Sequence, residues 1–312
     1  MGLGKMAPAS SAAQSGDIQQ AVEMPRQLQT YYYSWESRIG YRVLLGGTRH
    51  FGYWEKDTWW PFPIGASLRR MEDQMARILN LPKGSQVLDA GCGVGHVALR
   101  MARKHGLRVT AIDIIDHHVA KAQANIARAK DLPKGMVTAQ QMDYHYLEPF
   151  KDESFDGVYT METFVHSRDP AAVLAHFFRL IRPGGHLASF EYDNNMRPET
   201  PNLFSGSMHQ INKYASMPTN DVSHPGVLKR MIEDAGFINV EVRDWSDRIR
   251  PMTRLFFLVA FFPYLFVRLF RLERYFINTV TGVVSYVGGK HWRYVAISAT
   301  KPGDIIESGK SK

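Results

Sequence analysis

Glycines and acidic residues at close spacing are the side chains of this sequence that could do chemistry together. Gly91, Gly93 and Gly95 follow Asp89 in the run Asp-Ala-Gly-Cys-Gly-Val-Gly. Glycines let a backbone turn tightly and approach a ligand closely. A carboxylate directly before them would repel a pyrophosphate but suits a cationic ligand with an amino group. The spacing also differs from the Gly-x-Gly-x-x-Gly of dinucleotide sites, so the run indicates a cationic ligand.

Two further acidic residues follow where such a ligand would need them. Asp113 comes about twenty residues after the loop, where a carboxylate can accept both hydroxyls of a ribose. Ile114 follows it directly. Asp143 can accept the amino hydrogen of an adenine, and Met142 can pack on the ring. Three acidic strand ends in register with the glycine loop therefore predict one ligand site.

Strand and helix patterns alternate around these residues, and this alternation predicts how they are positioned. It predicts an α/β fold with a Rossmann-like doubly wound seven-stranded sheet, which binds ligands at the carboxyl ends of its strands. An N-terminal aromatic helical cap and an apolar helical insert before the last strand complete it. The expected strands are 86–89, 108–112, 136–140, 155–161, 186–192, 239–243 and 292–300, and the expected helices are 66–80, 96–104, 117–130, 171–181 and 225–235.

Residues 85–193 resemble the core of the class I S-adenosylmethionine-dependent methyltransferases. Val87-Leu-Asp-Ala-Gly-Cys-Gly-Val-Gly is similar to the first motif of that family, and Ser154-Phe-Asp-Gly-Val-Tyr and Leu180-Ile-Arg-Pro-Gly-Gly are similar to later motifs. The resemblance implies that S-adenosylmethionine is the cofactor. The candidate cofactor-binding residues are Tyr33, Asp89, Gly91, Cys92, Gly93, Gly95, Asp113, Ile114, Met142, Asp143 and Met161.

Within this family the sequence looks most like the sterol 24-C-methyltransferase and tocopherol methyltransferase group. The run from Ser154 to His166 resembles a motif of the sterol enzymes in which an acidic residue precedes a histidine by four positions. His50-Phe-Gly-Tyr-Trp resembles an upstream motif of the tocopherol enzymes. Two positions depart from the sterol pattern, because His96 stands where glycine is usual and Asp113 where asparagine is common. The resemblance suggests that an early tyrosine, for which we take Tyr33, reaches the carboxylate of the donor.

Glu162 and His166 are the candidate catalytic bases at the end of the fourth predicted strand. Methyl transfer is a displacement at a cationic sulfur, in which an enzyme mainly aligns donor and acceptor. A carbon acceptor also gives a cation, which needs aromatic faces and a base, whereas an oxygen or nitrogen acceptor needs a base or none. Both residues have structural alternatives: Glu162 could hold the donor or a backbone amide, and His166 could cap the following helix.

Aromatic residues are concentrated between residues 30 and 64. They can pack an N-terminal helix on the core, wall a hydrophobic ligand, or do both. The candidate acceptor-binding residues are His50, Tyr53 and Trp54. His117 and His118 are expected on a helix surface, and Cys92 is expected to pack rather than react. The histidines do not show the spacing of a metal-binding motif together with a cluster of carboxylates, so we predict no metal site.

An apolar, basic insert occupies residues 246–290. Residues 243–274 contain seven arginines and three acidic residues, which gives +4 of the net charge of +8. The apolar run 255–267 has 13 residues and contains Pro263. A spanning helix needs about 20 residues, so we expect none. The segment 246–274 fits a peripheral membrane contact, a lid over the acceptor pocket or the seam of a homodimer. Nucleic acid is not an expected partner, since the charges flank an apolar run.

Length and composition fit a globular protein of 312 residues, and its single cysteine excludes an intramolecular disulfide. We predict a flexible tail over 1–25, a helical cap over 26–80, the cofactor-binding core over 81–245, the insert over 246–290, and a last strand and tail over 291–312. The expected function is methylation of a hydrophobic small molecule. C-methylation of a sterol, terpenoid or other isoprenoid is preferred to O- or N-methylation of a phenol or alkaloid, and to an inactive binding protein. The expected location is cytoplasmic, with peripheral attachment to an intracellular membrane.

Overall fold

The computed structural model describes residues 26–34, 36, 40, 43–196 and 204–303. The tail predicted over 1–25 and the end of the chain from 304 onward therefore lie outside the described residues.

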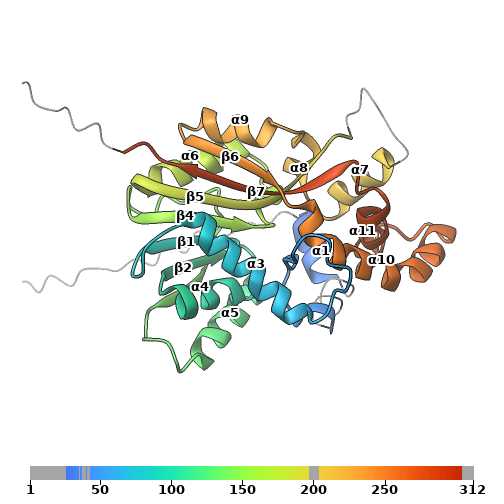
Figure 1. Ribbon diagram of the computed structural model, residues 1–312, viewed down its shortest axis with the longest axis horizontal. Helices are drawn as coiled ribbons and strands as arrows, with labels where there is room; N and C mark the ends of the chain where they lie inside the picture. Colours follow the sequence, from blue (N-terminus) through green and yellow to red (C-terminus); the bar gives the residue numbers. More distant parts are fainter. Residues whose placement is uncertain (1–25, 35, 37–39, 41–42, 197–203, 304–312) are drawn as a thin grey trace, which may run out of the picture.

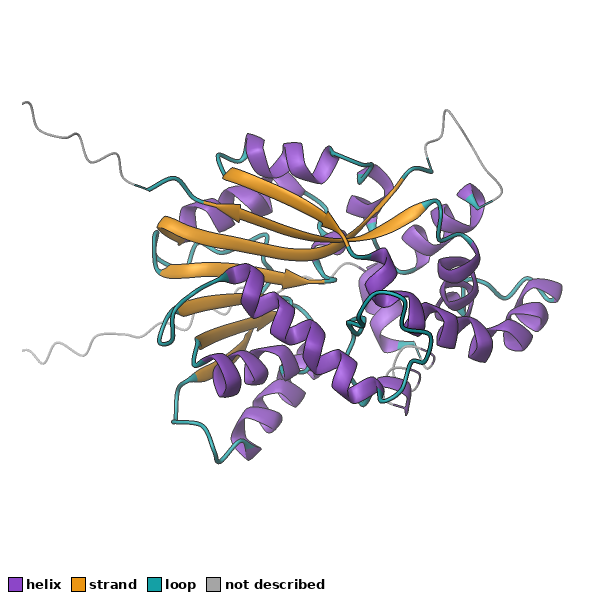
Figure 2. Cartoon of the chain, in the orientation of Figure 1, coloured by secondary structure: helices purple, strands orange, loops and turns teal. Residues whose placement is uncertain are grey.

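A seven-stranded sheet forms the centre of the molecule (Figures 1 and 2). Its order is β3-β2-β1-β4-β5-β7-β6, and β7 runs antiparallel to both of its neighbours. The pairs β3-β2, β2-β1, β1-β4 and β4-β5 are parallel. The predicted α/β fold and seven strands are thus confirmed. The strands are β1 (Gln86–Ala90), β2 (Arg108–Asp113), β3 (Val137–Gln141), β4 (Phe155–Met161), β5 (Ile181–Asn194), β6 (Ile238–Asp244) and β7 (Trp292–Thr300).

Amphipathic helices cover both faces of the sheet. On one face lie α3 (Ile64–Leu79), α4 (His96–His105) and α5 (Asp116–Arg128), and on the other lie α6 (Pro170–Leu180) and α9 (Val227–Asp234). The spacing of Leu68, Met71, Met75 and Leu79 puts all four on one side of α3, and all four are buried. This burial fixes the sheet as a rigid base for the residues at the carboxyl ends of its strands.

A second group of helices gathers beyond those strand ends. It consists of α1 (Arg26–Tyr33), α7 (Ser205–Tyr214), α8 (Pro218–Val222), α10 (Ser246–Leu269) and α11 (Ile277–Val287). In Figure 1, α10 and α11 lie together at the right-hand end, beside α7. A 3-10 turn, η1 (Phe164–His166), follows β4. These elements enclose the space next to the strand ends.

Two parts of the chain differ from expectation. The sequence predicts a strand only over 186–192, whereas β5 begins at Ile181 and contains Arg182-Pro-Gly-Gly. The other difference is α10, which continues for 24 residues through Pro251 and Pro263. Among the described helices it is long and apolar enough to cross a membrane, judged by length and composition alone. The helix is longer than the 13-residue apolar run because each proline removes one helical hydrogen bond without ending it, so the length of that run alone does not exclude a spanning helix.

Candidate active site

The glycine loop connects β1 to α4 and is held against the end of β2. The amides of Gly91 and Cys92 donate to the carbonyl of Ile112 at 2.9 and 2.8 Å. Gly91 has φ +97°, and a Cβ at this position would lie 2.1 Å from Oγ1 of Thr163. Only glycine therefore lets the loop lie this close to the segment that follows β4. Cys92 is buried, as expected of a packing residue.

Asp113 joins three parts of the cofactor-binding edge. Its carboxylate accepts from the amides of Gly93 and Ile115, both at 2.8 Å, and lies 3.5 Å from Nδ1 of His118. Its carbonyl accepts from the amide of Met142 at 3.1 Å. Burial raises the pKa of Asp113, but His118 and the two amides outweigh it and hold the pKa below its usual value. His118 is only 3% exposed, so its expected place on a helix surface is wrong.

The remaining predicted cofactor residues lie on the same edge of the sheet. Asp143 is buried and accepts from the amide and Nδ1 of His145 at 2.9 and 2.6 Å. Met161 ends β4 in a buried position, and Ile114 and Met142 are half-buried. Protein groups thus hold both Asp113 and Asp143 in place, and lone pairs remain on their oxygens for a ligand.

Asp89 tests whether a cationic cofactor fits this edge. It is 2% exposed, and its Oδ2 has no hydrogen-bond partner among the described residues. Burial raises the pKa of Asp89 to about 7, and the charge of Asp113 adds to this effect. A buried carboxylate without a partner is costly, and a cation beside it offsets that cost. Asp89 and the glycine loop therefore fit S-adenosylmethionine, which carries an ammonium and a sulfonium group.

We expect the affinity for S-adenosylmethionine to fall roughly tenfold for each pH unit below about 7, because a protonated Asp89 no longer attracts a cation. The folded-state pKa lies above the unfolded value, so the stabilising effect of this group on the apo protein is lost as pH rises through about 7. Asp89→Asn should therefore bind the cofactor weakly at all pH values, and its apo form should melt higher than wild type at pH 8. Calorimetric titration and thermal melting test both effects. A pH-independent affinity of the wild type would contradict the assignment.

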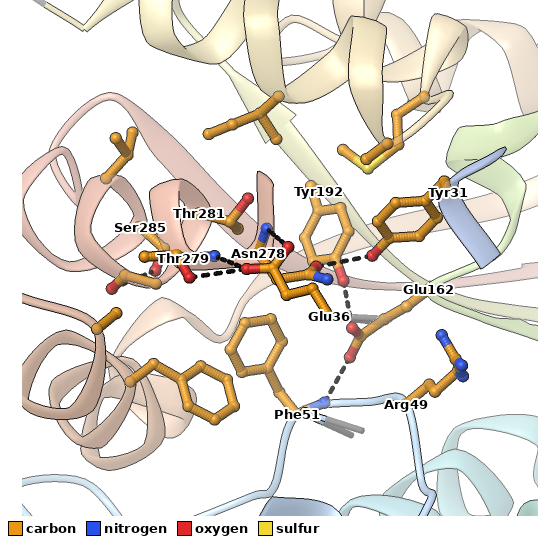
Figure 3. Close-up of a pocket in the computed structure, with 18 of the residues that line it drawn as sticks. Tyr31, Glu36, Arg49, Phe51, Glu162, Tyr192, Asn278, Thr279, Thr281 and Ser285 are labelled. Atoms are coloured by element: carbon orange, nitrogen blue, oxygen red, sulfur yellow. Dashed lines mark hydrogen bonds between the residues drawn. The ribbon is translucent and has the colours of Figure 1, made fainter. Parts of the chain in front are cut away.

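A cavity of about 330 Å³ lies next to this edge, among α1, α7, α10 and α11. Figure 3 shows that its walls come from segments far apart in the sequence. Glu162, His166, His50 and Arg49 also line it. Its aromatic walls suit a hydrophobic ligand. The aromatic residues are Tyr31, Tyr32, Phe51, Tyr192, Phe256 and Trp292.

Glu162 is held in the wall of this cavity by three donors. Oε1 accepts from the Phe51 amide at 2.7 Å and from the Tyr294 hydroxyl at 2.9 Å. Oε2 accepts from the Tyr192 hydroxyl, which Figure 3 also shows. Burial raises the pKa of Glu162, and these hydrogen bonds only partly oppose it. Glu162 also has φ +58°, an unusual backbone conformation of the kind found at functional sites. The predicted alternative, in which Glu162 accepts from a backbone amide, matches this geometry.

His166 is held at both ring nitrogens. Nδ1 lies 2.8 Å from the carbonyl of Ser216, and Nε2 lies 3.0 Å from the hydroxyl of Tyr32. A carbonyl only accepts, so Nδ1 carries the proton and Nε2 accepts from Tyr32. Burial lowers the pKa of His166, which keeps the ring neutral. His166 thus holds the side chain of Tyr32 in the cavity wall. The alternative in which His166 caps the following helix does not hold, since Asp169 caps α6 through the amide of Ala172.

Two predicted acceptor residues do not line the cavity. Tyr53 is buried in the core against Trp245, and Trp54 is buried in a cluster with Met252. Phe51, which the sequence analysis did not single out, lines the cavity instead. The sequence indicated the right segment, but the direction of each side chain depends on how an irregular loop lies on the core.

His50 does line the cavity, whereas Tyr33 points elsewhere. The Nδ1–H group of His50 donates to the carbonyl of Phe51 at 2.9 Å, and Nε2 lies 3.5 Å from Glu72. Tyr33 is 41% exposed and its hydroxyl donates to Asp116 at 2.5 Å. The structure therefore does not support Tyr33 as the residue that reaches the donor. Within the described part of the chain, no group of three His, Cys, Asp or Glu side chains is arranged to hold a metal ion.

The sheet order, the glycine loop and the acidic strand ends define a class I S-adenosylmethionine-dependent methyltransferase fold. Residues 88–189 match the methyltransferase domain family. The chain is 46% identical over 281 residues to the S-adenosyl-L-methionine-dependent Diels-Alderase iccD of Talaromyces variabilis, covering 89% of this chain and 95% of that protein. The chain therefore belongs to the class I S-adenosylmethionine-dependent methyltransferase family, and S-adenosylmethionine is its cofactor.

Two other similarities bear on the reaction. The O-methyltransferase resE of Aspergillus sclerotiorum is 28% identical, with 68% of this chain and 76% of that protein covered. The crystal structure of the [4+2]-cyclase SpnF superposes with a TM-score of 0.67 at 25% identity, covering 90% of this chain and 98% of that chain. The predicted fold, cofactor and enzyme family are confirmed. The predicted sterol and tocopherol group is not shown, since these relatives are a Diels-Alderase, an O-methyltransferase and a cyclase.

Proposed function

We propose that this protein is an S-adenosylmethionine-dependent [4+2] cyclase that acts on a hydrophobic polyene in the cavity. The observation that carries the proposal is the 46% identity to a Diels-Alderase across 95% of that protein. In a [4+2] cycloaddition a diene and an alkene form two carbon–carbon σ bonds while three π bonds become one. All atoms stay in the product, and no proton or group is transferred.

The cavity geometry supports a reaction that needs no general base. Glu162 already accepts from three donors, and both ring nitrogens of His166 are engaged. C-methylation of an alkene would need a base for the proton that the cation loses. A cycloaddition instead gains rate when a flexible chain is held in a reactive folded conformation. Aromatic walls can supply that constraint.

Two cationic or protonatable side chains can polarise a carbonyl conjugated with the reacting alkene. Arg49 lines the cavity, with its guanidinium 5.0 Å from the ring centre of Tyr32. Burial lowers the pKa of His50, but the charge of Glu72 outweighs it, and the net pKa is raised. Positive charge fixed in a dry site stabilises a developing negative charge effectively. S-adenosylmethionine supplies a further positive charge to such a carbonyl, or a methyl group if transfer occurs.

O-methylation of a hydrophobic hydroxyl compound is the second candidate. The similarity to an O-methyltransferase favours it, although that identity is 28%. The Tyr32–His166 pair in the cavity wall could also accept a proton from an acceptor hydroxyl.

The deciding experiment incubates the purified protein with methyl-labelled S-adenosylmethionine and a synthetic linear polyene that carries a diene and an enone. We expect a cyclised isomer of unchanged mass, no label in the product and no S-adenosylhomocysteine. Omission of the cofactor should slow the cyclisation. Label in the product with stoichiometric S-adenosylhomocysteine would contradict the proposal and support O-methylation.

A further inference from the structure

The outer side of α10 is strongly apolar, and it is exposed to solvent. Phe262 is 76% exposed, Leu269 75% and Leu258 65%. Of the most apolar stretch of this helix, only 17% is buried. Soluble monomers rarely expose apolar patches of this extent. In Figure 1 the helix lies at the end of the molecule, next to α11.

Aromatic residues from another part of the chain extend this surface. Trp59 and Trp60 are 68% and 64% exposed. The guanidinium of Arg254 lies 3.6 Å from the ring centre of Trp59, and it donates to the Trp59 carbonyl at 2.5 Å. Arg254 precedes Leu258 by one helical turn, so Trp59 continues the same side of α10, and the exposed Trp60 follows it in the chain. We define the apolar face as Trp59, Trp60, Leu258, Phe262, Phe266 and Leu269.

The charged residues beside this face are mainly arginines, which favour an anionic partner. Between residues 255 and 276 the charged side chains are Arg268, Arg271, Arg274 and Glu273, a net charge of +2. Arg268 pairs with Glu273 at 2.8 Å, while Arg271 and Arg274 are exposed. In a two-fold dimer through this face the same surface meets itself, so two surfaces of net positive charge would be brought together. Tryptophan and arginine around an apolar surface instead match the boundary of an anionic bilayer.

We propose that the apolar face binds the surface of an anionic lipid bilayer. The exposed part of α10, residues 258–269, is about 18 Å long at 1.5 Å per residue, well short of a hydrocarbon core of about 30 Å. The start of the helix is buried in the protein through Ile249 and Met252, and Phe256 lines the cavity. The helix therefore lies in the interface and enters one leaflet while the protein remains folded. This contact is independent of the reaction proposed above.

Flotation with vesicles tests the proposal without any substrate. The full-length protein is mixed with vesicles of phosphatidylcholine alone, or of phosphatidylcholine and phosphatidylserine in equal proportion. Phe262→Asp combined with Leu269→Asp removes the apolar contact, and Ile238→Asp, at an exposed position on β6, is the matched control. Arg271→Gln and Arg274→Gln should each lower the affinity for the phosphatidylserine-containing vesicles roughly fivefold at low salt. Thermal melting checks that each variant is folded.

We expect wild type and Ile238→Asp to float with the mixed vesicles and the Phe262→Asp/Leu269→Asp variant to stay in solution. Failure of the wild type to bind mixed vesicles would overturn the proposal. Equal binding by the folded double variant would also overturn it. If wild type is a dimer that binds no lipid and the double variant is a monomer, the face is an interface between copies.

Discussion

Gly91→Ala is expected to lose measurable binding of S-adenosylmethionine and to lower the free energy of unfolding by about 2–4 kcal/mol. The added Cβ would lie 2.1 Å from Oγ1 and 2.7 Å from Cβ of Thr163, inside any real contact distance. The backbone also has φ +97°, which alanine rarely adopts. The loop must therefore move away from Thr163 in the segment after β4, and the cofactor site is distorted. Thermal melting and calorimetric titration measure the two effects.

Gly93→Ala is the matched control, because a Cβ at Gly93 meets no atom within 4 Å and its φ of +52° is one that alanine adopts at modest cost. The strained φ should cost about 1–2 kcal/mol of unfolding free energy, less than at Gly91, and cofactor binding should weaken if the open space at Gly93 belongs to the ligand. In a second comparison, Thr163→Gly should restore part of the stability lost in Gly91→Ala, since the three atoms nearest to the added Cβ all belong to Thr163. Equal melting of Gly91→Ala and wild type would show that the loop does not need this close approach.

The cofactor site could be predicted from the sequence because its signals are local. Asp89 and Asp113 lie at the carboxyl ends of β1 and β2, and Asp143 lies two residues after β3. Parallel strands bring their carboxyl ends to one edge. No long-range information is needed to bring these residues together. The sequence does not show that His118 faces Asp113, five positions earlier at the end of β2. The two side chains meet only because α5 leaves the strand in a particular direction, and that direction depends on the fold.

The acceptor cavity could not be predicted in the same way. Its key contacts join residues far apart in the sequence, such as Tyr32 with His166 and Phe51 with Glu162. No periodicity encodes such pairs. Ser216, which fixes the tautomer of His166, acts through its carbonyl, and a backbone group carries no sequence signal at all.

The insert shows the limit of reading an apolar run by its length. The run 255–267 gives the position of the apolar segment, but the helix that contains it begins at Ser246. Its first turns are amphipathic, and they are helical because Ile249 and Met252 are buried against the core. The exposed tryptophans beside it come from a loop some two hundred positions earlier, so the full extent of the apolar face is visible only in the fold.

Glu162→Gln separates the two candidate reactions. Glutamine keeps one oxygen acceptor for the Phe51 amide, and its amide group can donate to a tyrosine oxygen, so we expect a folded protein of near wild-type stability. Since a cycloaddition moves no proton, the variant should cyclise a polyene within about threefold of wild type if the carboxyl only shapes the wall. If Glu162 is instead a general base for methyl transfer, the rate of transfer should fall by about 10²–10⁴.

Glu162→Ala should behave differently from the glutamine variant. It leaves the Phe51 amide and the Tyr192 and Tyr294 hydroxyls without their acceptor in a buried wall, at a cost of about 2–4 kcal/mol in unfolding free energy. Loss of the wall should also abolish selective cyclisation, because the polyene is no longer held in one folded form. Tyr192→Phe removes a single donor and should cost less. A folded Glu162→Gln variant without cyclisation, under conditions where Tyr192→Phe is active, would show that the carboxylate itself takes part in the reaction.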